Sequence, residues 1–285
     1  PPIDWATSEA RLTDVDVALN HDIKIEDVAH AGKHIDFANR HLHIGCIIPS
    51  ATQEEVLFSI RPELFIALLA TESLLPHEAV VIRGAPLFAR YSGYLHSFRY
   101  AGPGIGAGSA AADPTEIVAI DAIVAHSVGQ QLRASWFQRD LNKAYLGFSG
   151  FPSNEPLSSP LPADGWDPAL ISTGMWGCGV FMCNPTIKFC QQLMAAAVAG
   201  CRLVYSTFGK AETARSHAAL FAALVAADAS VGQLYRILQE RDAARCDPLD
   251  AYIIRIVSGE SDEGFAEYGT RRGFGWGADV RVLAP

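Results

Sequence analysis

Five residues within about twenty positions have side chains suited to acid–base chemistry: three carboxylates and two amides. They are Asp36, Asn39, Gln53, Glu54 and Glu55. If Gln53 opens a helix, Glu54 and Glu55 lie in its first turn, about 100° apart around the axis, where the helix dipole and free N–H groups attract a negative ligand. A carboxyl group in a dry cleft has a raised pKa and can donate a proton to a leaving oxygen. The same pair is also typical of an ordinary solvated helix start, so the pair alone does not decide between the two interpretations.

Two other segments have the composition of ligand-binding loops. Ser172–Phe181 carries three glycines in six residues, and the backbone N–H groups of such a loop can close around a diphosphate. Tyr91 and Tyr94, on either side of a glycine, could stack on a base or a ribose. Phe208 lies at the end of an expected strand, and ligands of α/β sheets gather at strand carboxyl ends. Taken alone, the glycine segment is more typical of a tight strand–helix connection, and the tyrosines are more typical of aromatic packing at a strand end.

The sequence argues against several other classes of protein. The formal net charge is −9, without the cluster of Lys and Arg that bulk nucleic-acid binding needs. The six cysteines form no CxxC pair, which is typical of buried, reduced thiols in an intracellular protein. The loose group of histidines from His30 to His43 lacks the spacing of a zinc site, and neither Ser50 nor Ser149 lies in a nucleophile elbow. No signal peptide or membrane span is recognisable.

The hydrophobic pattern predicts an α/β scaffold for these residues. Short apolar, β-branched runs indicate strands buried on both faces, and apolar helical spacing with start and stop signals indicates helices between them. The expected strands are 79–84, 116–122 and 202–208, and the expected helices are 53–60, 62–69, a segment within 127–148, 185–200, 212–224 and 231–240. We expect a Gly-rich loop at 102–109 and a Pro-rich loop at 149–167, and the tail from 258 onward supports no assignment.

Taken together and in this order, the segments resemble the catalytic domain of the poly(ADP-ribose) glycohydrolases, from about residue 5 to about residue 238. Any one matching piece could be chance, but nine in register are difficult to explain otherwise. They are Ile25-Glu26-Asp27, Ile35–Asn39, Gln53-Glu54-Glu55, Pro62-Glu63-Leu64, Tyr91–Tyr94, Ile117–Ala122, Leu141–Phe148, Trp176–Phe181 and Thr207-Phe208-Gly209.

The resemblance implies a three-layer macrodomain-like α/β fold, with a mixed central sheet flanked by helices. We expect one catalytic domain over 1–285, with the macrodomain core at about 15–240 and short extensions at both ends. The implied reaction is hydrolysis of the ribose–ribose O-glycosidic bond of poly(ADP-ribose), which releases ADP-ribose. Glu55 matches the family's general acid, which then deprotonates the attacking water.

The resemblance also implies roles for the residues around Glu55. Glu54 matches the residue that holds the ribose being released, and Asp36 and Asn39 match residues that order this site. Glu26 matches an acid that contacts adenine, and Tyr94 and Phe208 match aromatic ligand contacts. The other substrate-binding residues implied are Ile25, Gly45, Gln53, Gly177, Cys178, Gly179 and Phe181.

The resemblance further implies the partners and the setting. The ligand is poly(ADP-ribose) or ADP-ribose, the macromolecular partners are ADP-ribosylated proteins, and neither nucleic acid nor a membrane is bound directly. No metal or organic cofactor is implied. We expect a monomer located in the nucleus, the cytoplasm or both.

Three departures from the family pattern leave alternatives open. His43-Ile44-Gly45 stands where the family has three glycines, so His43 and Ile44 should reshape that wall of the ligand site. Met175 replaces an Asn, and Met182-Cys183-Asn184 replaces a Gly-Gly-Asp run. The alternatives are a module that binds ADP-ribose without cleaving it and a hydrolase that removes mono-ADP-ribose.

Overall fold

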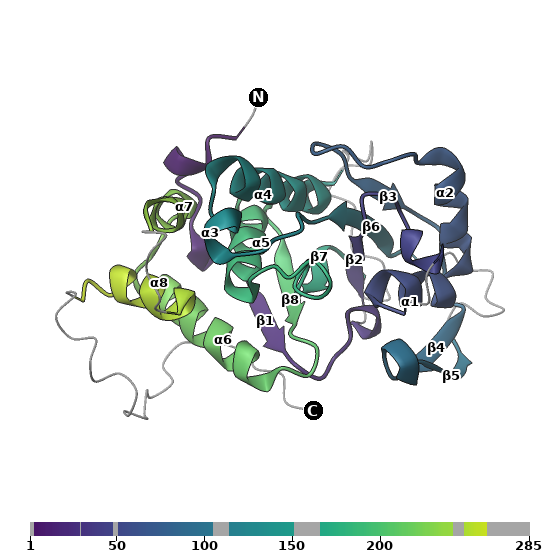
Figure 1. Ribbon diagram of the computed structural model, residues 1–285. Helices are drawn as coiled ribbons and strands as arrows, with labels where there is room; N and C mark the ends of the chain where they lie inside the picture. The colour runs from purple at the N-terminus through teal and green to yellow at the C-terminus, as the bar shows by residue number, and fades with distance from the viewer. Residues whose placement is uncertain are drawn as a thin grey trace.

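The fold is built on a six-stranded mixed sheet with the strand order β1-β8-β7-β2-β6-β3 (Figure 1). The computed structural model describes residues 3–28, 30–47, 51–104, 114–150, 166–241 and 248–260. All neighbouring strands of this sheet are parallel except β3, which pairs antiparallel with β6. The strands are β1 (Val17–Asn20), β2 (Ala31–Ala38), β3 (Val80–Ile82), β6 (Glu116–Asp121), β7 (Asp167–Gly174) and β8 (Arg202–Ser206). A separate hairpin joins β4 (Ala89–Ser92) and β5 (Arg99–Pro103).

Helices cover both faces of the sheet, as β6 shows. Successive side chains of a strand point to opposite faces, and Val118 and Ile120 pack in the cluster that contains α4 and α5. Ile117 packs instead with α1 residues, and Ala119 packs with Leu42. The result is the expected three-layer α/β arrangement with a mixed sheet.

The main helices are α1 (Gln53–Ile60), α4 (Ala134–Ser149), α5 (Pro185–Ala199), α6 (Ala211–Ala226), α7 (Val231–Glu240) and α8 (Leu249–Val257). Two helices of a single turn are α2 (Ala67–Ala70) and α3 (Val128–Gln131). Figure 1 shows α1, α2 and the hairpin at one end of the molecule and α6 to α8 at the other. None of the helices in the described part of the chain is long and apolar enough to cross a bilayer.

Helix α5 shows how local sequence sets these boundaries. The Asn184 side chain accepts a hydrogen bond from the Ile187 N–H at 3.1 Å, and Pro185 occupies the first turn. Gly200 ends the helix with φ 68°, a left-handed conformation that glycine adopts without a Cβ penalty. The expected helices at 53–60, 185–200, 212–224 and 231–240 are confirmed, with end shifts of one or two residues.

Several other expectations need correction. The segment 62–69 begins as a 3-10 helix over Pro62–Ile66 before α2, and 79–84 is a half-buried edge strand rather than one buried on both faces. Gly102 belongs to β5 instead of a loop. The strands β1, β2, β4 and β5 and the helix α8 were not expected, and of β7 only Leu170-Ile171 looked β-like. Ser149 and Asp167, expected in the Pro-rich loop, belong to α4 and β7. The segment 105–109, residues 151–165 of the Pro-rich loop and the tail from 261 lie outside the described residues.

Candidate active site

A cavity of about 590 Å³ opens at the carboxyl ends of β2, β6, β7 and β8, the edge at which ligands of open α/β sheets bind. The first turn of α1, the end of β4 and the connection between β4 and β5 complete its wall. Of the fourteen predicted site residues, thirteen line this cavity. They are Ile25, Glu26, Asn39, Gly45, Gln53, Glu54, Glu55, Tyr94, Gly177, Cys178, Gly179, Phe181 and Phe208.

Glu54 and Glu55 are 4% and 7% exposed and lie in the first turn of α1, so this is not a solvated acidic helix start. Both oxygens of Glu54 accept backbone N–H groups, from His43 at 2.8 Å and from Asn39 at 3.2 Å. Oε2 of Glu55 accepts the N–H of Thr52 at 3.0 Å and a bond from the Thr52 hydroxyl. The carboxylates are therefore held separately, and both face the cavity.

Gln53 fixes this helix start against the central strand. Its Oε1 accepts the Phe37 N–H at 2.8 Å, and its Nε2 donates to the Ile35 carbonyl at 3.2 Å. The side-chain amide thus bonds a backbone N–H and a backbone carbonyl of β2, as the main chain of a neighbouring strand would. Burial raises the pKa of the Tyr94 hydroxyl, and the backbone N–H of Gln53 partly offsets that rise, so the aromatic side of the cavity lies near the same helix.

Asp36 lies beneath the cavity and is absent from its lining. It is fully buried on β2, and neither carboxyl oxygen has a hydrogen-bond partner among the described residues. Burial, followed by the negative charges of Glu54, Glu55 and Glu26, raises its pKa well above the ordinary value. Burial and the neighbouring carboxylates therefore favour the protonated, neutral form of Asp36.

Burial also changes the protonation of Glu54. It raises the pKa of this carboxyl to about 7, although the N–H groups of His43 and Asn39 lower it, and the charge of Glu55 adds a smaller rise. A carboxyl group with a pKa near neutrality exchanges its proton readily at working pH. The floor of the cavity thus holds fewer negative charges than its carboxyl groups suggest.

Gly45 occupies a position where only glycine fits. A Cβ added there would lie 2.0 Å from Glu55 Oε1, so the loop backbone is packed directly against the carboxylate. Ile44, its neighbour, also lines the cavity and is 41% exposed.

His43 lies outside the cavity lining. It adopts φ 56°, and its ring stacks on Phe58 at 4.3 Å with Phe65 edge-on at 5.0 Å. The expectation that both His43 and Ile44 reshape the cavity wall therefore needs correction, because only Ile44 lines the cavity.

The glycine loop after β7 rests on the end of β6. Gly177 has φ 73°, and a Cβ there would lie 2.7 Å from the Ala122 Cβ. The Trp176 indole N–H donates to the Ile120 carbonyl at 2.9 Å, which anchors the loop from below. Burial raises the pKa of the Cys178 thiol to about 12, so this cysteine stays a thiol and is not an activated nucleophile. Met175, in place of the expected Asn, lines the same wall.

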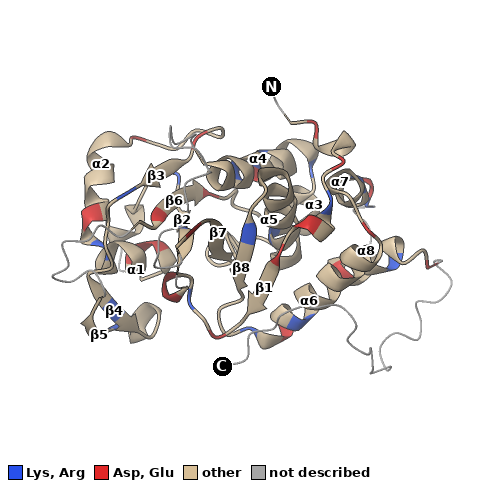
Figure 2. Cartoon of the chain, turned by 180° about the vertical axis from the view of Figure 1, so that it is seen from behind, with Lys and Arg blue, Asp and Glu red and all other residues tan. Residues whose placement is uncertain are grey.

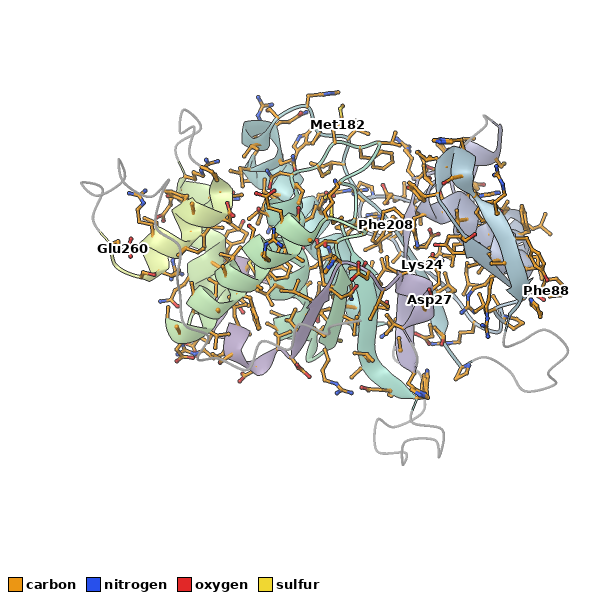
Figure 3. All side chains as sticks on the ribbon, turned by 90° about the horizontal axis from the view of Figure 1, so that it is seen from below. Lys24, Asp27, Phe88, Met182, Phe208 and Glu260 are labelled. Carbon is orange, nitrogen blue, oxygen red and sulfur yellow. The ribbon has the colours of Figure 1, made fainter. Side chains whose placement is uncertain are left out.

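Aromatic and acidic residues form the opposite side. The rings of Tyr94 and Phe208 meet edge to face, with centroids 4.8 Å apart. Glu26 is buried beside them, and its Oε2 accepts the Tyr91 hydroxyl at 3.4 Å, while Oε1 has no partner among the described residues. Figure 3 shows Phe208 and Lys24 close together near the middle of the molecule. This side can therefore take a planar group with a hydrogen-bond donor.

Several lining residues were not predicted from the sequence. Thr52 had a readable signal, because Thr52-Gln53-Glu54-Glu55 is the S/T-x-x-E capping pattern. Lys24 and Lys210 also line the cavity, and nothing in the sequence marked them beyond their closeness to Glu26 and Phe208. In the described part of the chain, no three His, Cys, Asp or Glu residues are placed to hold a metal ion.

Comparison with known proteins gives a consistent result. A family model described as poly(ADP-ribose) glycohydrolase, macro domain fold, matches residues 3–215. Poly(ADP-ribose) glycohydrolase 2 of Caenorhabditis elegans is 31% identical over 250 residues, which cover 82% of this chain and 48% of the relative. Poly(ADP-ribose) glycohydrolase 1 of the same organism is 30% identical over 237 residues, which cover 78% of this chain and 29% of the relative. Poly(ADP-ribose) glycohydrolase 1 of Arabidopsis thaliana is 29% identical over 282 residues, which cover 78% of this chain and 51% of the relative. The chain thus spans at most about half the length of these relatives.

Proposed function

Because the chain belongs to the poly(ADP-ribose) glycohydrolase family and its macro domain fold, we propose that it hydrolyses the ribose–ribose O-glycosidic bonds of poly(ADP-ribose) and releases ADP-ribose. One observation carries this proposal: two adjacent carboxyl groups, Glu54 and Glu55, are both buried and both line a cavity at the carboxyl ends of the strands. A module that only binds ADP-ribose has no need of two buried carboxyl groups at this point.

Glu55 is the proposed general acid and base. Its carboxyl group protonates the leaving ribose oxygen as the bond to the anomeric carbon breaks and positive charge develops there. The resulting carboxylate then takes a proton from the water that attacks the anomeric carbon, which restores the acid. The contacts of Oε2 with Thr52 and the close packing of Gly45 support this role, because both restrict where the carboxyl group can point.

Glu54 is the proposed anchor for the ribose. Both of its oxygens are oriented by backbone N–H groups, so ribose hydroxyl groups meet a fixed acceptor. Glu26 would accept a hydrogen bond from adenine through its unpartnered Oε1. The loop at Gly177–Gly179 would face the diphosphate, while Tyr94 and Phe208 pack against the ligand. The polymer attached to ADP-ribosylated proteins, in the nucleus or the cytoplasm, is the substrate that this arrangement would meet.

An assay with labelled poly(ADP-ribose) tests the proposal by measuring free ADP-ribose. We expect the unaltered protein to release ADP-ribose. Glu55→Gln should lose turnover while still binding ADP-ribose in calorimetry. Glu72→Gln changes an exposed residue and should behave as the unaltered protein does. Binding of ADP-ribose without any release from the polymer would instead identify a reader, and release from singly modified proteins alone would identify a mono-ADP-ribosyl hydrolase. If Glu55→Gln hydrolyses the polymer normally, the assignment of the acid is wrong.

A further inference from the structure

The cavity poses an electrostatic problem for the proposed ligand. Glu26, Glu54 and Glu55 all line it, and a diphosphate brings further negative charge. Like charges brought together in a partly dry site repel strongly unless cations or oriented N–H groups offset them. Oriented N–H groups, a positive group or both must therefore lie where the diphosphate binds.

Lys24 and Lys210 are the cations among the cavity-lining residues that the structure describes. Lys24 is already engaged: its Nζ donates to the Tyr91 carbonyl at 2.8 Å, lies 3.8 Å from the centre of the Tyr91 ring and is 4.0 Å from Asp27. Among the described residues, only the backbone of Lys210 forms hydrogen bonds, and its ammonium has no hydrogen-bond or ion-pair partner. Lys210 is thus the cation that remains available to a ligand.

The turn after β8 places Lys210 beside the glycine loop. Phe208 and Gly209 both have positive φ, 48° and 78°, and they turn the chain back into α6. The Lys210 backbone is fixed because its N–H donates to the Thr207 carbonyl at 3.2 Å and its carbonyl accepts the Thr207 hydroxyl at 2.9 Å. Lys210 is the N-cap of the 16-residue helix α6, so the helix dipole adds to its positive charge. Figure 2 shows basic residues in blue on and just before α6, and acidic residues in red on α1.

The charge of Lys210 acts on the glycine loop. Burial raises the pKa of the Cys178 thiol, and the positive charges of Lys188 and then Lys210 lower it. Lys188 is buried and paired with Asp140, whereas Lys210 is exposed toward solvent. The loop N–H groups, the start of α6 and the Lys210 ammonium therefore surround one region of the cavity.

We propose that Lys210 is a substrate-binding residue that holds the diphosphate of ADP-ribose against the glycine loop and so favours phosphorylated over neutral ligands. This inference rests on the proposed function, since it takes ADP-ribose as the ligand. An ammonium and phosphate oxygens form charge-assisted hydrogen bonds. Because Lys210 is exposed, salt screens the interaction.

A charge series at position 210 tests this, with calorimetric binding of ADP-ribose and of adenosine, which lacks phosphate. We expect Lys210→Arg to bind ADP-ribose as the unaltered protein does, Lys210→Ala to bind it about fivefold more weakly, and Lys210→Glu to bind it about twentyfold more weakly. Adenosine binding should not change, and the loss for Lys210→Ala should shrink at higher salt. Arg215→Ala and Arg215→Glu change an exposed cation on the same helix and serve as matched controls without effect.

Two results would overturn the inference: ADP-ribose affinity within twofold across the series, or an equal loss for adenosine, which would indicate a structural change instead. The outcome is separable from that of the proposed function. Turnover of the polymer together with a flat charge series rejects the role of Lys210 alone. ADP-ribose binding with a graded charge series but without polymer turnover rejects the glycohydrolase proposal alone. A protein that does not bind ADP-ribose refutes both.

Discussion

Glu54 should make the protein less stable as pH rises from acid to neutral. In the folded state burial raises the pKa of this carboxyl from 4.5 to about 7. Between these values the folded protein holds a proton that the unfolded chain has released. The free energy of unfolding therefore falls with rising pH in this window, and it levels off above pH 7, where both states are deprotonated.

The structure gives the magnitude. Each pKa unit corresponds to about 1.4 kcal/mol, so the rise from 4.5 to about 7 amounts to about 3 kcal/mol over the whole window. Glu54 is only 4% exposed, so solvent screening reduces this value little. Most of it, about 2.5 kcal/mol, falls between pH 5 and pH 8.

Glu54→Gln removes the titrating group and keeps nearly the same shape. One backbone N–H, that of Asn39 or His43, then faces the amide nitrogen and loses its acceptor, at a cost of about 1 kcal/mol. That cost does not depend on pH. We therefore expect the variant to gain about 2.5 kcal/mol relative to the unaltered protein between pH 5 and pH 8, whatever the offset at pH 5.

Urea denaturation followed by tryptophan fluorescence at several pH values measures this difference. Glu72→Gln, at an exposed position, controls for the loss of a carboxylate as such and should show no comparable trend. If the difference between the unaltered protein and Glu54→Gln stays constant within about 0.5 kcal/mol from pH 5 to pH 8, Glu54 does not titrate as its burial requires.

Two further predictions concern the neighbours of the site. In Gly45→Ala the new Cβ would lie 2.0 Å from Glu55 Oε1, so the carboxyl group must move. Turnover of the polymer should fall at least about 100-fold, while the circular dichroism spectrum stays unchanged. Near-normal turnover would contradict the role of Glu55. Lys188→Met leaves the buried Asp140 carboxylate with Arg139 as its charged partner and with the Ile123 N–H as a hydrogen-bond donor. Lys188→Met should lower the free energy of unfolding measured in urea by about 3 kcal/mol. The double variant Lys188→Met/Asp140→Asn should recover part of this loss. A double variant that is less stable than Lys188→Met would show that the charge pair is not the cause.

The sequence predicted β3, β6 and β8 of the main sheet but missed the edge strand β1 and the central strand β2. β6 was recognisable because Ile117–Ile120 is an uninterrupted apolar run between turn residues. β2 lies next to it and is just as buried, but it carries Lys33, His34 and Asp36. The Lys33 ammonium reaches the Phe148 carbonyl at 2.9 Å, and Asp36 faces the acidic cluster. Polar residues in a central strand break the apolar pattern, and here one of them lies directly beneath the candidate site.

The candidate site was predictable by residue type and order, but its internal contacts were not. The resemblance named thirteen residues that line the cavity, because their order along the chain is distinctive. The packing of Gly45 on Glu55 and the pairing of Gln53 with Phe37 and Ile35 depend on how α1 is set against β2. That placement comes from tertiary packing, which short motifs do not encode.

His43 shows why the effect of a substitution in the site depends on backbone direction as well as on residue size. A side chain in place of glycine should fill the cavity if it points inward, but φ 56° turns the His43 side chain outward onto Phe58. A left-handed conformation costs a non-glycine residue about 1 kcal/mol, and an aromatic pair contributes about 1 kcal/mol, so stacking on Phe58 offsets the strain. The His43 N–H remains directed at Glu54, as a glycine N–H would be. Of the two side chains that stand in place of glycine, Ile44 is therefore the one that alters the ligand's surroundings, because it lines the cavity next to the glycine that Glu55 requires.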